Sequence, residues 1–260
     1  MSTFSLFDYF VAGGAALIAG GINGIAGGGT LVSFPALIAI GVPALPANIT
    51  NTVALSPGYL SGSVAARDDL TPQRDRMRTL APFAVVGGLA GALLLEVTPE
   101  STFRAVVPWL VLASCALLLA QDRVRDLVQS RSVAGPTGAV PTSAAGPALC
   151  ATVLVASVYG GFFGAGLGIM LLAVLGVFCS DSLVRLNAAK QVLSFLINVV
   201  AAVCFAVTGH VRWQLVPVMA VAALLGGVVG SRMAQRVDPM LLRRLVVVFG
   251  VGVAIDLFVT

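Results

Sequence analysis

The stretch "GGINGIAGGGTLVSFPALIAIGV" (20–42) is a long apolar segment broken by glycines, and a counterpart follows later, "YGGFFGAGLGIMLLAVLGVF" (159–178). Each is apolar enough to enter a bilayer, while its glycines let the chain leave helical geometry. A broken helix exposes N–H and C=O groups, which is tolerated at membrane depth only inside protein or beside water. The two stretches therefore predict a membrane protein with two hairpins of short helices hinged at glycines.

The composition favours the same class. Of 260 residues, 58% are hydrophobic and 10% are charged, whereas about 25% are charged in an ordinary soluble domain. The formal net charge of +4 comes from arginines at the ends of apolar segments, where they orient a membrane protein. We therefore expect an all-α polytopic membrane protein whose partner is the lipid bilayer, with no nucleic-acid partner.

The chain divides into two similar halves. Residues 121–146 are charged at first and then rich in Gly, Pro, Ser and Thr, which predicts a flexible cytoplasmic linker. It separates a first transmembrane repeat, 1–120, from a second, 147–260. In each half the glycine-broken segment precedes a short polar element, "ANITNTVAL" (47–55) or "LNAAKQVLS" (186–194). We expect each repeat to be a Gly-broken hairpin followed by three transmembrane helices.

The arginines predict the orientation of the two halves. The connections 67–78 and 232–244 and the linker are all arginine-rich, so all three belong on the cytoplasmic side. The linker and 232–244 share a side only if an even number of crossings separates them, so the hairpin within 147–179 must return to the side it entered. Each half then crosses an odd number of times, which gives inverted-topology repeats with both termini outside.

The glycine clusters are the first candidate binding elements. Backbone N–H groups at the start of a half-helix attract anions through their donors and the helix dipole. The alternative is close helix packing, which regularly spaced glycines permit. The candidate residues of the two hairpins are Gly27, Gly28, Gly29 and Thr30, and Gly164, Gly166 and Gly168.

The polar element after each hairpin is the second candidate. Amides and hydroxyls here can donate hydrogen bonds to anionic oxygens, whereas helix N-capping would require only one such residue. Aligning the two polar elements places Asn51 opposite Lys190 and Thr52 opposite Gln191. The candidate residues are Asn48, Asn51 and Thr52, with Asn187, Lys190 and Gln191.

Lys190 is the only lysine in the chain, and it lies about one turn into an apolar segment. A lysine within a membrane span is costly and points to function, although its long stem could reach the interface. A cation near the positive end of its own helix dipole is unfavourable, which favours an anionic partner. Because Asp and Glu are absent from the apolar centres, the substrate itself could be that partner.

Several catalytic and cofactor motifs are missing. The sequence has no Walker motif, no HExxH, a single histidine and no nucleophile elbow, so ATP hydrolysis, a metal site and acyl-transfer chemistry are not indicated. We expect neither a cofactor nor an enzyme activity. The sequence leaves the oligomeric state open, a homo-oligomer included.

The stretch "NGIAGGGTLVSFPALIAIGVPALPANITNTVALSPGYLSGSVAAR" (23–67), with "RLNAAKQVLSFLINVVAAVCFAVTGHVRW" (185–213), resembles the sulfite exporter TauE/SafE family, also called the toluene-sulfonate uptake permease family. The resemblance covers nearly all of the chain except the linker. It implies a multi-pass transporter of the bacterial inner membrane for small anions such as sulfite, organosulfonates, related sulfur compounds or organic acids. It leaves the anion and the direction of transport open.

The expected function is secondary transport of a small anion by alternating access. Two alternatives stay open at this point. A passive anion channel would use the same glycines and lysine, and a non-transporting membrane assembly or partner-binding protein would bury the glycine faces against another subunit.

Overall fold

The structure, a computed structural model, describes residues 4–25, 28–65, 67–134, 145–208, 210–233 and 239–259. Every regular element in this part of the chain is a helix. The elements are α1 (Leu6–Ile25), α2 (Thr30–Ala39), α3 (Ala44–Ala65), α4 (Arg67–Leu70), the 3₁₀ turn η1 (Thr71–Gln73), α5 (Arg74–Glu96), α6 (Glu100–Ala134), α7 (Pro147–Phe162), α8 (Leu167–Phe178), α9 (Leu183–Thr208), α10 (Val216–Met233) and α11 (Pro239–Val259).

The two glycine-broken segments form the predicted hairpins. Helices α1 and α2 are the arms of the first, and α7 and α8 are the arms of the second. The short arms have 10 residues in α2 and 12 in α8, or roughly 15 and 18 Å at helical rise. That is about half of the 30 Å hydrocarbon core, which corresponds to hinges near mid-membrane. The described hinge residues Gly28, Gly29, Ala165 and Gly166 are buried within the protein. In each half three long helices follow, α3, α5 and α6 or α9, α10 and α11.

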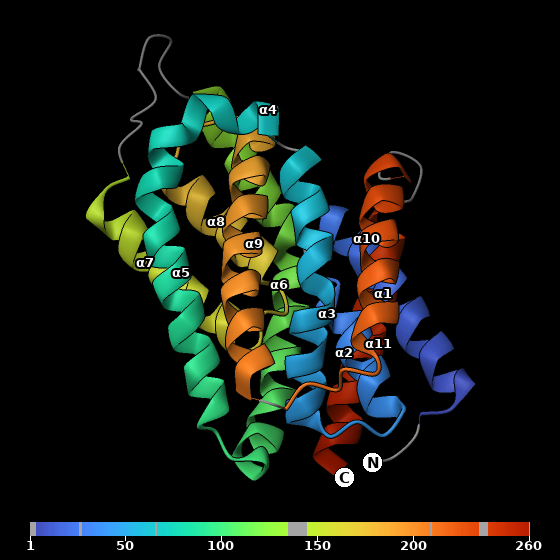
Figure 1. Cartoon of the computed structure of the whole chain (residues 1–260). Helices are drawn as coiled ribbons and strands as arrows, with labels where there is room; N and C mark the ends of the chain where they lie inside the picture. Colours follow the sequence, from blue (N-terminus) through green and yellow to red (C-terminus); the bar gives the residue numbers. More distant parts are fainter. Residues whose placement is uncertain are drawn as a thin grey trace.

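The helices run broadly along one common axis, and both chain termini lie at the same end (Figure 1). At that end Thr208 Oγ1 donates to Glu96 Oε1 at 2.7 Å, and Leu45 N donates to Glu100 Oε1 at 3.2 Å. Helix α4 lies at the opposite end, where Arg76 of α5 pairs with Asp181 at 3.2 Å. The arginine-rich turn before α5 is thus at the end away from the termini.

Four helical segments of the described part are long and apolar enough to cross a membrane: Leu6–Asn23, Arg67–Glu96, Glu100–Ser130 and Leu183–Thr208. Helix α3 has 22 residues but is not among them, because Asn48, Thr50, Asn51, Thr52 and Ser56 lower its hydropathy. All five of these polar side chains are buried. Helix α3 is therefore polar towards the protein interior.

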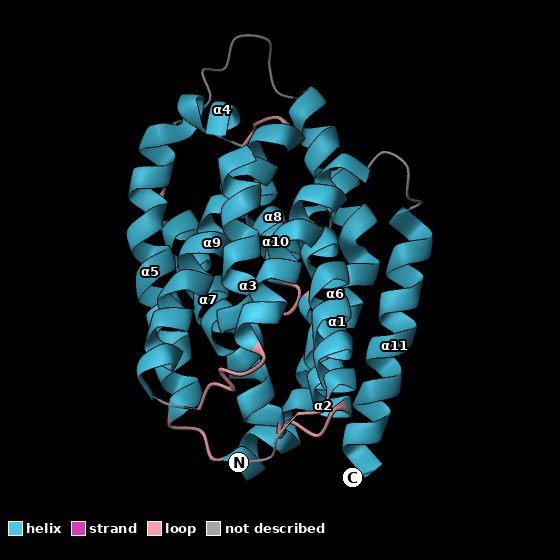
Figure 2. Ribbon diagram, turned by 45° about the vertical axis from the view of Figure 1, so that its right-hand side comes forward, coloured by secondary structure: helices cyan, strands magenta, loops and turns pink. Residues whose placement is uncertain are grey.

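The helices of the two halves interlock. Helix α1 packs along α10, and α7 packs along α5, so the first arm of each hairpin lies against a helix of the other half. Helices α3 and α9 pack against each other at the centre of the bundle (Figures 1 and 2), and α6 packs against α11. One apolar cluster draws residues from both halves around α1, α2, α3 and α6, and a second surrounds α7, α8 and α9.

Glycines make the closest helix crossings feasible. A Cβ on Gly91 would collide with the carbonyl oxygen of Val158, and one on Gly161 with that of Gly88, where α5 crosses α7. At the crossing of α1 and α10, a Cβ on Gly226 would collide with the carbonyl oxygen of Leu17. These glycines follow the packing alternative, because small residues let two backbones approach closely.

The predicted linker begins later than residue 121. Helix α6 continues to Ala134, so residues 121–134 are helical. Val124, Leu127 and Val128 recur at helical spacing, and Val128 is buried against Gly176 of α8. Apolar anchoring of this face extends the helix despite the charged residues around it. Residues 135–144 lie outside the described part of the chain, and the division into two repeats stays a prediction.

The α5–α7 crossing makes a testable prediction about glycine. Gly91→Ala should lower the free energy of unfolding by roughly 1–3 kcal/mol, because the added methyl group overpacks the interface. Gly14→Ala in α1 is the control, since a Cβ there meets no atom within 4 Å. It should be neutral or stabilising by up to about 1 kcal/mol. Unfolding of the purified variants by SDS titration in detergent micelles measures both, and equal effects would contradict the crossing.

Candidate functional site

The first hinge joins α1 to α2 and is held by polar side chains. Its described residues, Gly28 and Gly29, are buried, and the Gly29 amide donates to Asn23 Oδ1 at 2.8 Å. The buried side chain of Tyr59 on α3 lies beside the side chains of Asn23 and Thr30 and interacts with both. Helix α2 starts without a side-chain cap. The hinge is thus tied to α3, and its Gly29 N–H is already used.

The second hinge, residues 163–166, joins α7 to α8 and relies on left-handed backbone. Gly164 has a φ of +76° and Gly166 a φ of +74°, a conformation that glycine adopts without a steric cost. The carbonyl of Ala165 accepts from Ser114 Oγ at 3.0 Å and from the Tyr159 hydroxyl. Helix α8 also starts without a side-chain cap. The hinge is held through its carbonyl, which leaves the start of α8 uncapped.

The two hinges meet on helix α6. A Cβ on Gly28 would touch Leu118 at 3.2 Å, and one on Gly166 would touch Ser114 at 3.7 Å. Because Ser114 and Leu118 are one helical turn apart, the hinges lie roughly 6 Å apart along α6. The rings of Phe34 on α2 and Phe163 in the second hinge also pack edge to face, with centroids 5.5 Å apart. The sequence pattern suggested two related elements, and the fold brings them together.

Helix α3 contacts both hinges. Asn48 Nδ2 donates to the carbonyl of Phe162 at 2.9 Å, at the end of α7, while Tyr59 reaches the first hinge. Asn51 lies between these two residues in sequence and is 1% exposed. Thr52 donates its hydroxyl to the carbonyl of Asn48 at 3.0 Å, so its proton is committed within its own helix.

Helix α9 brings Lys190 into the same interior. Leu186, Leu193 and Ile197 face an apolar cluster, while Gln191 Nε2 lies against Gly62 of α3. Helical geometry places Lys190 on the same stripe as Leu186 and Leu193, at the edge that adjoins Ser194 one turn on. Lys190 is 2% exposed, so its side chain does not reach the surface. Among the described residues it has no hydrogen bond or ion pair.

Unpartnered polar atoms concentrate on the two central helices. Among the described residues, four buried side-chain atoms lack a hydrogen-bond partner: Asn48 Oδ1, Asn51 Oδ1, Ser194 Oγ and Gln121 Oε1. The first three belong to α3 and α9, which pack against each other. Buried polar atoms in folded proteins nearly always have partners, so a local group of exceptions indicates a place for water or a ligand.

The predicted residues divide into three groups. Most of them are buried around the hinges and the central helices: Gly28, Gly29, Thr30, Asn48, Asn51, Thr52, Gly166, Gly168, Lys190 and Gln191. Two are half-buried, Gly164 and Asn187. Gly27 lies outside the described residues. Their role in binding stays a prediction.

Sequence reasoning missed four residues that hold the hinges, Asn23, Tyr59, Ser114 and Tyr159. They are scattered single residues that form no motif in the sequence, so no local signal identified them. What they bond to depends on which helices meet. The described residues contain no cluster of three or more histidines, cysteines or carboxylates that could hold a metal ion.

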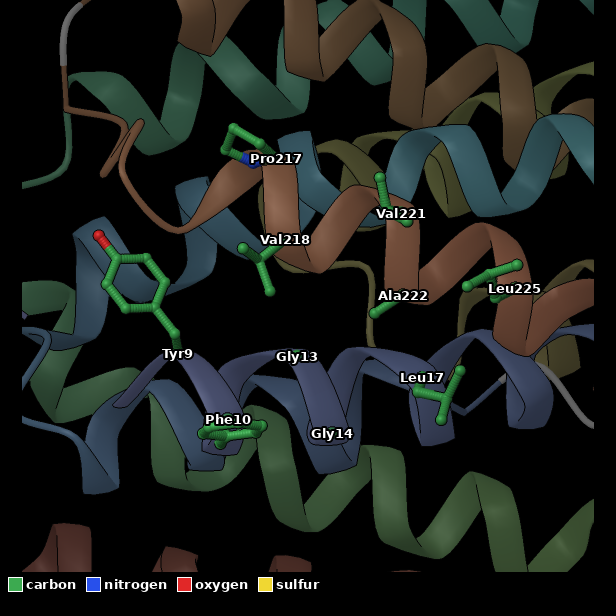
Figure 3. A pocket seen from close by; sticks show the side chains of 10 residues that line it. All are labelled: Tyr9, Phe10, Gly13, Gly14, Leu17, Pro217, Val218, Val221, Ala222 and Leu225. Carbon is green, nitrogen blue, oxygen red and sulfur yellow. The ribbon is translucent and has the colours of Figure 1, made fainter. Parts of the chain in front are cut away.

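A wide apolar groove lies elsewhere, between α1 and α10 (Figure 3). It has a volume of about 620 Å³ and is lined by Tyr9, Gly13, Leu17, Val218 and Leu225 among others. Its lining residues are apolar apart from the hydroxyl of Tyr9. None of the predicted site residues lines it, and its chemistry suits hydrocarbon and not an anion.

Comparisons with known proteins agree on one class. The family described as "Sulfite exporter TauE/SafE" matches residues 12–257. The "Probable membrane transporter protein ORF9" of Sinorhizobium is 28% identical over 246 residues, covering 94% of this chain and 89% of that protein. The "Probable membrane transporter protein YfcA" of Escherichia coli K12 is 27% identical, covering 90% and 83%. A "Probable membrane transporter protein" of Haemophilus influenzae is 27% identical, covering 89% and 87%. No solved structure matches the chain.

The contact of Tyr59 with Asn23 and Thr30, which holds the first hinge to α3, makes a testable prediction. Tyr59→Phe should lower the free energy of unfolding by about 1–3 kcal/mol, because the buried side chains of Asn23 and Thr30 lose a partner. Hydrogen exchange at the Gly29 amide should become faster. Tyr9→Phe is the matched control, since that ring lines the apolar groove, and it should change neither quantity measurably. The role of Tyr59 as a clamp would be wrong if the two variants behaved alike.

Proposed function

Since this chain belongs to the sulfite exporter TauE/SafE family, we propose that it is a secondary transporter for small anions that works by alternating access. The family match and the relatives establish a multi-pass membrane transporter of the bacterial inner membrane. The proposal adds the class of substrate, the site and the mode of transport. The substrate class is sulfite, an organosulfonate, a related sulfur compound or an organic acid.

The observation that carries the proposal is the group of unpartnered polar side chains between α3 and α9. Among the described residues, Asn51 and Ser194 are each 1% exposed and each has a side-chain oxygen without a partner, of which the Ser194 hydroxyl can donate to an anion. Lys190 is 2% exposed and forms no ion pair in the same part of the chain. Leaving such groups unpartnered costs free energy. A transporter needs polar groups reserved for its substrate, whereas a purely structural interface would satisfy them within the protein.

The charges of the site favour an anion. The uncapped starts of α2 and α8 lie within the protein and direct the positive ends of their helix dipoles to the interior. Lys190 supplies the only basic side chain in the interior of the described helices, because the other buried basic residue, Arg76, is paired with Asp181. We propose that backbone amides near Gly28 and Thr30 and near Gly166 and Gly168 bind anionic oxygens, because the Gly29 and Gly164 amides are already bonded within the protein. The side-chain N–H groups of Asn48, Asn51, Asn187 and Gln191 would add hydrogen bonds. In this arrangement Lys190 provides the balancing charge.

The packing supports a structural repeat, and the arginine-rich connections favour its inverted form. If each helix of the first half is exchanged for its counterpart in the second, α1 against α10 becomes α7 against α5, and both pairs are in extensive contact. The same exchange converts α3 against α10 into α9 against α5, again two observed contacts. In repeats of this kind, one bundle rocks against the other around a fixed central site. The hinges on α6 are well placed to border both access routes.

Binding of anions is the first test of this function. Sulfite, thiosulfate, sulfate, sulfoacetate, taurine and simple carboxylates are added to purified protein, and the melting temperature is recorded. A substrate should raise it with dose, and Lys190→Gln should weaken that binding by at least about tenfold. Arg212→Gln is the control, because this exposed arginine bonds through its backbone, to Thr50 and Leu215, and its side chain forms no ion pair among the described residues. An anion that stabilises Lys190→Gln and wild type equally would remove Lys190 from the site.

The inverted topology is tested by measuring which end of the helix bundle faces the outside of the cell. Ser101 and Ser180 are exposed at opposite ends of the bundle, and each is changed to cysteine in a chain whose four native cysteines are replaced. A membrane-impermeant maleimide added to intact cells should label Ser101→Cys only, because the arginine-rich end faces the cytoplasm. Ser180→Cys should react after permeabilisation. The reverse pattern would invert the assignment, and labelling of both in intact cells would contradict it.

A further inference from the structure

We propose that Lys190 is also a proton-binding site, so that one proton travels with each anion. This inference rests on the proposed function, because it needs an anion at the same site. It concerns the charge of the lysine in the empty transporter and the source of the energy for transport. The burial of Lys190 and the absence of a counter-charge carry the argument.

Lys190 is isolated from compensating charge. Its side chain is 2% exposed, and no carboxylate of the described residues pairs with it. On the helices packed against α9, Arg76 near the start of α5 pairs with Asp181, and α6 carries Asp122, Arg123, Arg125 and Asp126 in its second half. None of these residues forms an ion pair with Lys190 in the described part of the chain. The titratable groups further inside those helices are uncharged phenols and thiols, Tyr59 of α3, Cys115 of α6, and Cys150 and Tyr159 of α7.

Tyr59 and Tyr159 are engaged at the hinges, and the cysteines are free thiols in apolar clusters. None of these groups offers a negative charge to Lys190. A carboxylate partner would have made it a structural ion pair. Its absence leaves the lysine dependent on something that enters from outside the protein.

The cost of burying a charge then determines whether the Lys190 amine is protonated when no anion is bound. An unpaired ammonium in a low-dielectric interior costs several kcal/mol, whereas a neutral amine avoids that cost. An anion placed against the amine reverses the preference, because opposite charges stabilise each other strongly when water is excluded. Anion binding and proton binding therefore favour each other, and linkage makes that coupling reciprocal.

This coupling gives a balanced transport cycle. The neutral amine accepts a proton from the aqueous side that is open, and its nitrogen lone pair forms the new N–H bond. The monovalent anion and the ammonium together have no net charge, as the empty site has none. Both the empty and the loaded states can change conformation without burying net charge. The state with anion alone has one uncompensated negative charge and is disfavoured, so proton and anion move together and leave on the other side.

The experiment measures protons taken up on anion binding, with methanesulfonate as the probe because this strong acid stays ionised and carries no proton itself. Isothermal titration calorimetry of the detergent-solubilised protein at about pH 9 is repeated in buffers of different ionisation enthalpy. An exposed lysine is almost fully protonated at that pH and would take up little. The expected result for wild type is an uptake close to one proton per anion. Above the pH at which the empty site loses its proton, affinity should fall by about tenfold per pH unit.

Variants separate the possible outcomes. Lys190→Arg keeps a permanent charge, so where it folds it should bind with no proton uptake and no steep pH dependence; Arg212→Gln should behave as wild type. Wild-type binding without proton uptake overturns the proton site and leaves the anion transporter intact. If methanesulfonate, isethionate and toluenesulfonate all fail to bind at any pH, both the anion function and this inference are wrong.

Discussion

The structure depends on one constraint of the membrane, which is that backbone groups released from a broken helix must find partners within the protein. Both hairpins meet it with side chains from elsewhere in the chain. Asn23 accepts the Gly29 amide, and Ser114 and Tyr159 donate to the carbonyl of Ala165. The hinges therefore cannot lie against lipid, and the bundle must close around them. The close crossings at Gly91 and Gly226 let it do so.

The same constraint explains why some buried polar side chains of the described interior have atoms without a hydrogen-bond partner. Helices α3 and α9 bring amides, hydroxyls and a lysine into a region that the hinges have already made polar. Some of these groups are consumed in holding the hinges, as Asn48 shows through its bond to Phe162. Within the part of the chain that the structure describes, Asn51 Oδ1 and Ser194 Oγ are left without a partner, and Lys190 is left without a counter-ion. The proposed site for a small anion rests on this excess of polar groups over structural need, together with the positive charge that Lys190 would supply.

The prediction of fold from sequence succeeded where one physical signal dominated. Runs of apolar residues identified the membrane class, and the glycine clusters located both hinges, at residues near 28 and 165. Boundaries governed by packing were harder. Residues 121–134 have the composition of a linker but continue α6, because Val128 finds an apolar surface on α8. Tyr59 and Ser114 gave no local pattern, since their partners lie on other helices.

The sequence by itself determined that this chain enters the membrane, that it has two glycine-broken hairpins, and that a single lysine lies in an apolar segment. These are properties of composition and short-range periodicity, and hydrophobic transfer and backbone geometry suffice to interpret them. Only the tertiary structure decided that the two hinges meet within a turn on α6 and that Thr52 is committed to its own helix. It also decided that Lys190 is buried with no counter-ion among the described residues. Those outcomes depend on which helices pack together, because a polar group's free energy is set by the neighbours that folding brings to it.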